Sequence, residues 1–192
     1  AAAASSLTTT ALQSVVAGTA QNITVTMRDL YGNIATGYQG TVNFSSTDSQ
    51  AALPGSYTFT AADAGTHVFS ITLKSSGGQS LTVTDSTNPL MTSFQKDIPI
   101  IAGAAVGFSV RSSSNVTAGV AVSITLIAVD AYGNTDTNYR GKVHFSGPSG
   151  GGNILPADYT YTAADAGTHI FSLTLASTGT QTITIQDLLD TK

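Results

Sequence analysis

The stretch YTFTAADAGTHVFSITL at residues 57–73 decides the fold, because it returns as YTYTAADAGTHIFSLTL at residues 159–175. The likeness extends outward from this stretch. The segment AGTAQNITVTMRDLYGNIATGYQGTVNFS begins at Ala17, and the segment AGVAVSITLIAVDAYGNTDTNYRGKVHFS begins at Ala118. Matched positions lie 101 or 102 residues apart. Self-similarity at a fixed period indicates that one structural unit is repeated along the chain.

The duplication also sets the expected domain boundaries. It continues through QSLTVTD at 79–85, which returns as QTITIQD at 181–187. The two copies therefore span nearly the whole chain, and each is long enough to bury a core of its own. We expect one domain at residues 1–102 and a second at residues 103–192.

Within a copy, apolar residues recur at every second position. Ile23, Val25 and Met27 alternate with polar residues, as do their counterparts in later segments. Strict alternation over short runs predicts β-strands with one buried face. In the first copy we expect strands at residues 7–16, 20–28, 40–46, 56–61, 66–74, 79–85 and 92–100. Seven short strands in about 100 residues are typical of an immunoglobulin-like β-sandwich. The predicted fold class is therefore all-β, with two tandem immunoglobulin-like β-sandwiches.

Three repeated motifs carry a resemblance to a known family. They are D-x-Y-G-N from Asp29, Y-x-G-x-V-x-F from Tyr38 and Y-T-x-T-A-A-D-A-G-T-H-x-F-S-x-T-L from Tyr57. Together they resemble bacterial immunoglobulin-like repeats, which occur in tandem in large surface proteins of the invasin and intimin type; filamin repeats share the strand plan. The resemblance implies an extracellular, non-catalytic stalk, spacer or adhesive module. Its implied partners are neighbouring repeats or copies of the same protein.

Composition excludes several classes of function. The chain has 192 residues, a formal net charge of −4 and only seven Lys and Arg residues. This stock cannot form a basic patch, so nucleic acid is not an expected partner. No apolar stretch approaches the roughly 20 residues of a membrane-spanning helix, so we expect no membrane insertion. Cysteine is absent, which excludes disulfides, zinc thiolate sites and thiol nucleophiles.

The second copy stops before the counterpart of the last strand of the first. Lys192 aligns with Leu90, whereas the segment TSFQKDIPI follows at residues 92–100 in the first copy. We therefore expect the second sandwich to lack its last strand within this chain. Three interpretations stay open: truncation of a longer array, a strand donated by a neighbouring molecule through β-strand addition, or a domain that tolerates six strands.

The acidic residues are all Asp, and we assign them no catalytic, cofactor-binding or metal-ligating role. Asp side chains at strand ends can bind calcium, and Asp29, Asp85 and Asp130 are the candidates for such a site. No dense acidic loop supports it, so capping of turns is the competing interpretation. Asp63 and Asp165 recur beside turn glycines, as scaffold residues do. With no G-x-S-x-G motif either, we predict that the protein is not an enzyme.

Histidines and tyrosines complete the set of candidate residues. His67 and His169 occupy the same position in each repeat, and their strand parity predicts that they point inward at the rim of the sandwich. Four tyrosines lie in or just beyond the expected turns: Tyr31, Tyr132, Tyr38 and Tyr139. Exposed aromatic rings can stack on sugars, so the alternative function is a carbohydrate-binding module accessory to a secreted enzyme or adhesin. The competing interpretation is that these rings cover the ends of the sandwich.

Overall fold

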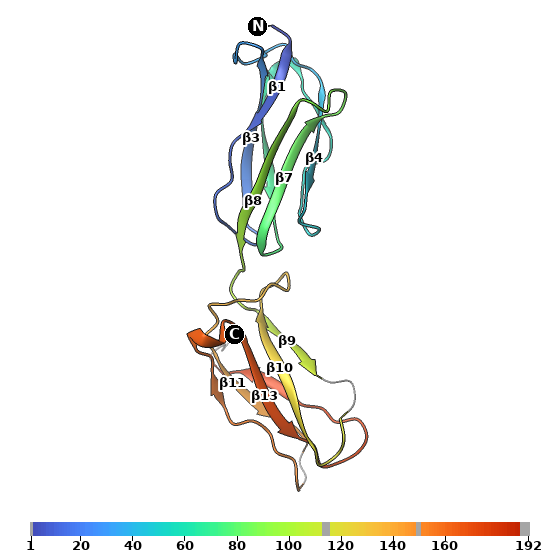
Figure 1. Ribbon diagram of the computed structural model, residues 1–192, viewed down its shortest axis with the longest axis vertical. Helices are drawn as coiled ribbons and strands as arrows, with labels where there is room; N and C mark the ends of the chain where they lie inside the picture. Colours follow the sequence, from blue (N-terminus) through green and yellow to red (C-terminus); the bar gives the residue numbers. More distant parts are fainter. Residues whose placement is uncertain (1, 113–115, 149–150, 189–192) are drawn as a thin grey trace. The chain divides into compact units, whose positions relative to one another are not determined.

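The computed structural model describes residues 2–112, 116–148 and 151–188, and it confirms the all-β prediction (Figure 1). The chain divides into two compact units, Ala1–Ala102 and Gly103–Lys192, called unit 1 and unit 2 below. Helical structure in the described residues is limited to two 3-10 turns, η1 at Ala61–Asp63 and η2 at Ala163–Asp165. No described helix has the length and apolar character needed to cross a membrane.

Unit 1 consists of two facing sheets. Its strands are β1 (Ala4–Thr9), β2 (Val15–Val16), β3 (Ala20–Asp29), β4 (Thr41–Ser46), β5 (Tyr57–Thr58), β6 (Thr66–Thr72), β7 (Gly77–Asp85) and β8 (Thr92–Ile101). One sheet has the order β1-β3-β6 and the other the order β2-β8-β7-β4-β5. All pairs are antiparallel except β2 with β8. Two antiparallel sheets joined in this order form an immunoglobulin-like sandwich.

Two predicted strands of unit 1 have different bounds in the structure. The strand expected at residues 7–16 is split, because β1 pairs with β3 in one sheet and β2 pairs with β8 in the other. The chain must cross between the sheets in the interval. The strand expected at residues 56–61 is reduced to Tyr57–Thr58, because the chain turns at once into η1.

The core of unit 1 lies between its sheets and is closed by β8. Ile23, Val25 and Met27 of β3 are fully buried, as their alternation predicted. Ile98 and Ile100 of β8 are 0% and 4% exposed. Burial of each such side chain contributes roughly 1.5–3 kcal/mol relative to leaving it in water. The last strand is therefore part of the core as well as part of the sheet.

Unit 2 repeats this plan with fewer strands. Its strands are β9 (Gly107–Ser112), β10 (Ala121–Val129), β11 (Lys142–Ser146), β12 (Tyr159–Thr160), β13 (Thr168–Thr174) and β14 (Thr184–Asp187). The sheets have the orders β13-β10-β9 and β12-β11-β14. In the described part of unit 2, β14 is paired only with β11, and neither β2 nor β8 has a counterpart. Within the described residues, the second sandwich therefore has no strand equivalent to β8, as the sequence predicted.

Candidate functional site

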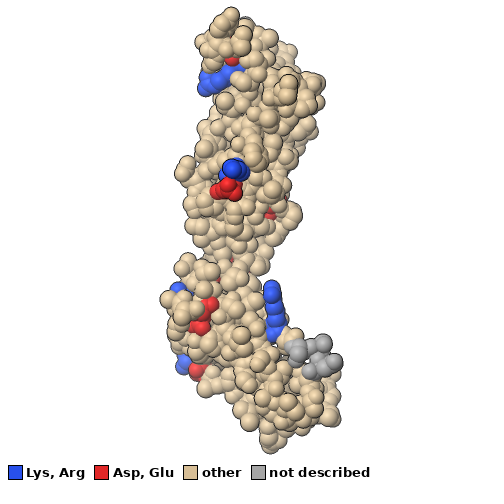
Figure 2. Space-filling view, viewed as in Figure 1, with Lys and Arg blue, Asp and Glu red and all other residues tan. Residues whose placement is uncertain are grey.

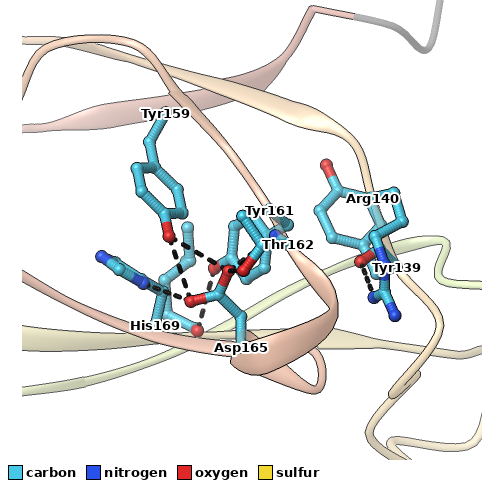
Figure 3. Close-up of polar contacts among 8 residues, drawn as sticks. Tyr139, Arg140, Tyr159, Tyr161, Thr162, Asp165 and His169 are labelled. Atoms are coloured by element: carbon cyan, nitrogen blue, oxygen red, sulfur yellow. Dashed lines mark hydrogen bonds and ion pairs between the residues drawn. The ribbon is translucent and has the colours of Figure 1, made fainter.

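A dense group of polar side chains surrounds Asp165 in unit 2 (Figure 3). Its Oδ2 accepts hydrogen bonds from the Thr162 backbone N–H at 2.6 Å and the Thr162 hydroxyl at 2.7 Å. The Tyr159 hydroxyl donates at 3.0–3.1 Å, and His169 Nδ1 lies 2.5 Å from Oδ1. The His169 ring also stacks on Tyr159, with ring centroids 3.9 Å apart. We call these four residues the Asp165 cluster.

Unit 1 contains the same group around Asp63, called the Asp63 cluster. Asp63 accepts from the Thr60 N–H at 2.6 Å and the Thr60 hydroxyl at 2.8 Å. His67 Nδ1 lies 2.6 Å away, and the Tyr57 hydroxyl donates at 3.1–3.2 Å. Each Asp is the last residue of its 3-10 turn, and its carboxylate accepts the backbone N–H of the N-cap threonine, as in a capping box. The motif T-A-A-D therefore encodes a capped turn, and the tyrosine and histidine of the longer motif hold the cap in place.

The carboxylates of Asp63 and Asp165 are ionised near neutral pH. The Thr60 N–H and His67, followed by the Thr60 hydroxyl, hold the pKa of Asp63 below its usual range. For Asp165, burial opposes ionisation, but hydrogen bonds from Thr162 and His169 outweigh it and lower the pKa. Burial and then the neighbouring carboxylate raise the pKa of Tyr57 and of Tyr159. An ionised Asp has no proton to donate, so it is suited to accept hydrogen bonds from the neutral Tyr and is not suited to act as a general acid.

The histidine of each cluster is oriented by its carboxylate. In the described residues, the hydrogen bonds of His67 and His169 are made through Nδ1 to the carboxylate. A nucleophile would have to bond to the other ring nitrogen, with the carboxylate acting as the orienting group. The histidines are half-buried and pack on aromatic rings, as the parity of their strands predicted.

Gly65 shows why the motif D-A-G cannot vary at its last position. Its backbone φ is +79°, and an added Cβ would lie 2.6 Å from the carbonyl oxygen of Ala35. A side chain would therefore be strained and would also collide with the neighbouring loop. The turn above the Asp63 cluster is packed directly against the loop that carries the D-x-Y-G-N motif.

The D-x-Y-G-N motif closes its own loop in both units. Asp29 Oδ1 accepts the N–H groups of Tyr31 and Asn33 at 2.9 and 3.0 Å. Asp130 Oδ1 accepts the equivalent N–H groups of Tyr132 and Asn134, both at 2.9 Å. Burial opposes ionisation of both carboxyls, but these hydrogen bonds outweigh it and lower their pKa values.

The Y-x-G motif positions a third repeated carboxylate. The Tyr38 hydroxyl donates to Asp85, and the Tyr139 hydroxyl donates to Asp187 at 2.5 Å. The Tyr38 ring lies so close to Gly40 that any Cβ there would collide with it. Asp85 Oδ1 also accepts the Thr87 N–H at 2.7 Å. Despite its burial, these hydrogen bonds lower the pKa of Asp85.

The structure offers little to the calcium candidates Asp29, Asp85 and Asp130. Each carboxylate already accepts several hydrogen bonds from its own loop, so a cation would have to compete with them. In the described part of the chain, no group of three or more Asp, Glu, His or Cys side chains is arranged to hold a metal ion. The hydrogen bonds from Tyr31, Thr87 and Tyr132 are those of Asp side chains that cap turns.

The four candidate tyrosines differ in their exposure to solvent. Tyr31 is 79% exposed, as expected of a turn residue. Tyr132 is half-buried, and Tyr38 and Tyr139 point their hydroxyls at buried or half-buried carboxylates. Of these rings, Tyr31 alone presents most of its surface to solvent.

The structural roles of two buried carboxylates could not be predicted from the sequence. Asp48 accepts the N–H groups of Lys74 and Ser75 at 2.5 and 3.0 Å, joining two loops of unit 1. Asp136 accepts the Ala105 N–H at 2.9 Å and is 8% exposed. Neither recurs in the other copy, so the repeat gave no signal for them. Their departure from the repeat was the one available clue.

Charged side chains are sparse on the surface as well as in the sequence. They make up 9% of the residues, against about 25% in an average soluble domain. Figure 2 shows isolated basic and acidic groups separated by broad uncharged areas on the face drawn.

Comparison with known proteins gives structural likeness alone. No family model matches the chain, and no curated protein matches it significantly in sequence. The surface layer protein SbsC, domains 4–9, is 16% identical with a TM-score of 0.39, and invasin, a bacterial integrin-binding protein, is 20% identical with 0.43. A β-glycosidase from Bacteroides vulgatus is 12% identical with 0.41.

Each of these alignments covers 95% of this chain but only a minor part of the other protein. The covered shares are 29% of the SbsC chain, 36% of invasin and 23% of the β-glycosidase. Similarities of this size do not bear on the function of this chain.

Proposed function

We propose that this chain is a non-catalytic structural or adhesive repeat module of an extracellular, cell-surface protein. The observation that carries the proposal is the commitment of the repeated polar residues to their own loops. Neighbouring N–H and O–H groups donate hydrogen bonds to the carboxylates of Asp29, Asp63 and Asp85. The counterparts of these residues in unit 2 accept hydrogen bonds in the same way. Repeated residues that stabilise turns favour a structural role for the repeat over a binding or catalytic role.

The backbone at the boundary between the units supports a spacer role. β8 ends at Ile101, and the Gly103 N–H donates to Asp130 Oδ2 at 2.9 Å. The Ala105 N–H donates to Asp136 Oδ2, also at 2.9 Å. The chain therefore passes from the last strand of unit 1 into hydrogen bonds within unit 2, with almost no free backbone.

Spin labels on the two units test the spacer role. The chain has no cysteine, so Ser70→Cys and Ser172→Cys place one label on an exposed, equivalent strand position in each unit. We expect electron–electron resonance to give a single narrow distance distribution. A broad distribution, typical of freely jointed domains, would contradict the proposal. Replacement of Asp130 and Asp136 by Ala should broaden the distribution while each unit stays folded by hydrogen exchange.

The alternative role in carbohydrate binding has a direct test. A glycan array probed with the chain and with its Tyr31→Ala variant should show no sugar whose binding depends on Tyr31. A glycan bound by the chain and lost in Tyr31→Ala would favour a binding module instead. Turnover of any glycoside by the chain would overturn the non-catalytic assignment.

A further inference from the structure

The outer side of β13 in unit 2 is a free strand edge. β13 pairs with β10 on one side (Figure 1), and in the described residues its other side meets only Ile154, at Thr174. Thr174 exchanges both backbone hydrogen bonds with Ile154, at 2.8 and 2.9 Å. Backbone groups of alternate residues point to the same side of a strand, so those of Thr168, Ile170 and Ser172 also point away from β10. Within the described part of the chain these groups have no backbone partner.

The free segment Thr168–Ser172, called the β13 edge below, lacks the features that protect edge strands. Natural edges are kept from pairing with other chains by charged residues, proline, bulges or a very short strand. β13 has seven residues, with no bulge and no Lys, Arg, Asp, Glu or Pro among them. By contrast, β2, β5 and β12 have two residues each, β1 carries a bulge and β9 carries Arg111. Ile170, at the centre of the β13 edge, is 65% exposed.

The equivalent strand of unit 1, β6, differs at two positions that affect pairing. Val68 stands at the position of Ile170 and is 55% exposed. Lys74 lies two residues beyond the end of β6, whereas Ala176 stands at that position in unit 2. A lysine beside an edge strand discourages pairing, because its charge would be brought against the partner strand. The β13 edge therefore exposes more apolar surface than β6 and has less charge beside it.

The β13 edge is complementary to itself. Its sequence, T-H-I-F-S at 168–172, places a hydroxyl residue two positions before and two positions after Ile170. If two such strands pair antiparallel about Ile170, the isoleucines of the two copies lie opposite each other, and Thr168 of each lies opposite Ser172 of the other. Thr–Ser hydrogen bonds stabilise antiparallel pairs, and two opposed isoleucines bury apolar surface. With no Lys, Arg, Asp or Glu in β13, no repulsion between like charges within the strand opposes the pairing of two identical copies.

We infer that the β13 edge pairs with the β13 edge of a second copy of the chain, antiparallel and centred on Ile170. The backbone groups of Thr168, Ile170 and Ser172 then exchange hydrogen bonds across a two-fold axis, and the sheet β13-β10-β9 continues into that of the second copy. The contact is short and buries less than the roughly 1,200 Å² of a stable interface, so we expect a Kd of roughly 0.1–1 mM. The pairing is independent of the spacer role proposed above, because that role concerns the two units of one molecule.

Cysteine cross-linking tests both the pairing and its register. The chain has no cysteine, so Ile170→Cys introduces one thiol, which would lie opposite its copy at a Cα separation of about 5.5 Å, within the range of a disulfide. We expect a disulfide-linked dimer on mild oxidation. Ser123→Cys is the matched control, because Ser123 is exposed on the same face of the sheet but lies opposite Ser172 on β10. Its thiols would be three strand spacings apart, so they should cross-link at least about tenfold more slowly. Equal rates would overturn the inference.

A charged substitution tests the pairing without oxidation. Ile170→Lys should weaken self-association at least about tenfold, because two lysines would lie directly opposite each other. Val68→Lys makes the same change in unit 1 and should leave association unchanged. Sedimentation equilibrium at about 1 mM chain measures the association. Hydrogen exchange should show that the Ile170 and Ser172 amides gain protection as the concentration rises, whereas those of Val68 and Ser70 do not.

Protection of the β10 amides verifies that each variant is folded. The absence of association at about 1 mM, or a dimer that persists in Ile170→Lys, would overturn the inference. So would a dimer that is weakened equally by Val68→Lys, because that result would place the contact outside the β13 edge.

Discussion

Unit 1 and unit 2 share their hydrogen-bonded turns but bury their cores to different depths. The Asp63 and Asp165 clusters match bond for bond, with the same donors at nearly the same distances. The sheets differ, because β7 has β8 at its side and β14 has no described partner there. The same turns therefore form with or without the last strand, whereas full burial of the core depends on it.

The comparison separates two sources of stability in this fold. Turns are closed by residues within a few positions of one another, as Asp29 with Asn33 shows. The core is closed by residues far apart in sequence, as Val15 with Ile100 shows. Local closure is available to any copy of the repeat. Long-range closure requires the whole set of strands.

The largest expected difference between the units concerns equivalent core leucines. Leu73→Ala should destabilise unit 1 by about 2–5 kcal/mol, because Leu73 is fully buried and a cavity would remain. Leu175→Ala should cost unit 2 only about 1 kcal/mol, because Leu175 is already half in contact with water. Hydrogen exchange of β6 and β13 amides measures each unit separately. Equal losses in the two units would refute the difference in burial.

A smaller effect is expected from the polar contact that joins β8 to the crossing between the sheets. Gln95 Oε1 accepts the Leu12 N–H at 2.8 Å, and Gln95 Nε2 donates to the Leu12 carbonyl at 2.6 Å. Gln95→Ala should cost unit 1 about 2 kcal/mol, since both backbone groups lose their partner. Denaturant unfolding followed by hydrogen exchange should show unit 2 unchanged. Gln39→Ala, at an exposed position, is the matched control and should have no measurable effect.

The carboxylate clusters should respond alike in the two units. Asp63→Asn and Asp165→Asn should each lower stability by a similar, small amount, because the amide keeps one acceptor oxygen but cannot accept at the other position. Thermal unfolding of each variant, read separately for each unit, measures the loss. A large loss in one unit only would show that the last strand supports the turns after all.

Acid should weaken the same clusters, and the sign follows from the lowered pKa values of Asp63 and Asp165. In the unfolded chain an Asp titrates near about 3.9. The folded pKa is lower, so the stabilisation is complete above about pH 4 and is lost as the pH falls towards the folded pKa. Unfolding free energy measured from pH 7 down to pH 2 should fall below pH 4. The two Asn variants should show a shallower fall.

The smallest effect is expected when a pair of surface residues in unit 2 is replaced by the equivalent pair from unit 1. Ser56 Oγ donates to Asn43 Oδ1 at 2.6 Å in unit 1, and the same positions in unit 2 hold Asp158 and His144, also 2.6 Å apart. Lys142 lies 2.9 Å from Asp158. Replacing His144 by Asn together with Asp158 by Ser should change stability by no more than about 0.5 kcal/mol, because the groups are exposed. A loss of several kcal/mol on urea unfolding would show that this ion pair is a structural element of unit 2.

Much of the architecture could be predicted from the sequence, because it rests on local pattern. The alternation at Ile23, Val25 and Met27 predicted a strand with one buried face, and all three side chains are buried in the structure. The split of the first strand could not be predicted, because it depends on β1 and β2 pairing with different sheets. Asp136 could not be identified either, because its partner Ala105 lies 31 positions away and the first copy has alanine at the matching position.

The parallel pairing of β2 with β8 determines how unit 1 carries tension. Val15 and Val16 lie beside Ile100 and Ile101, and the Ala17 N–H donates to the Ile101 carbonyl at 2.8 Å. A pull on the two ends of unit 1 draws these parallel strands past each other along their length. Their hydrogen bonds are then loaded together in shear instead of being peeled apart one at a time. Because β8 runs parallel to β2, the strand that completes the sandwich also makes unit 1 resist unfolding by a pull on its two ends.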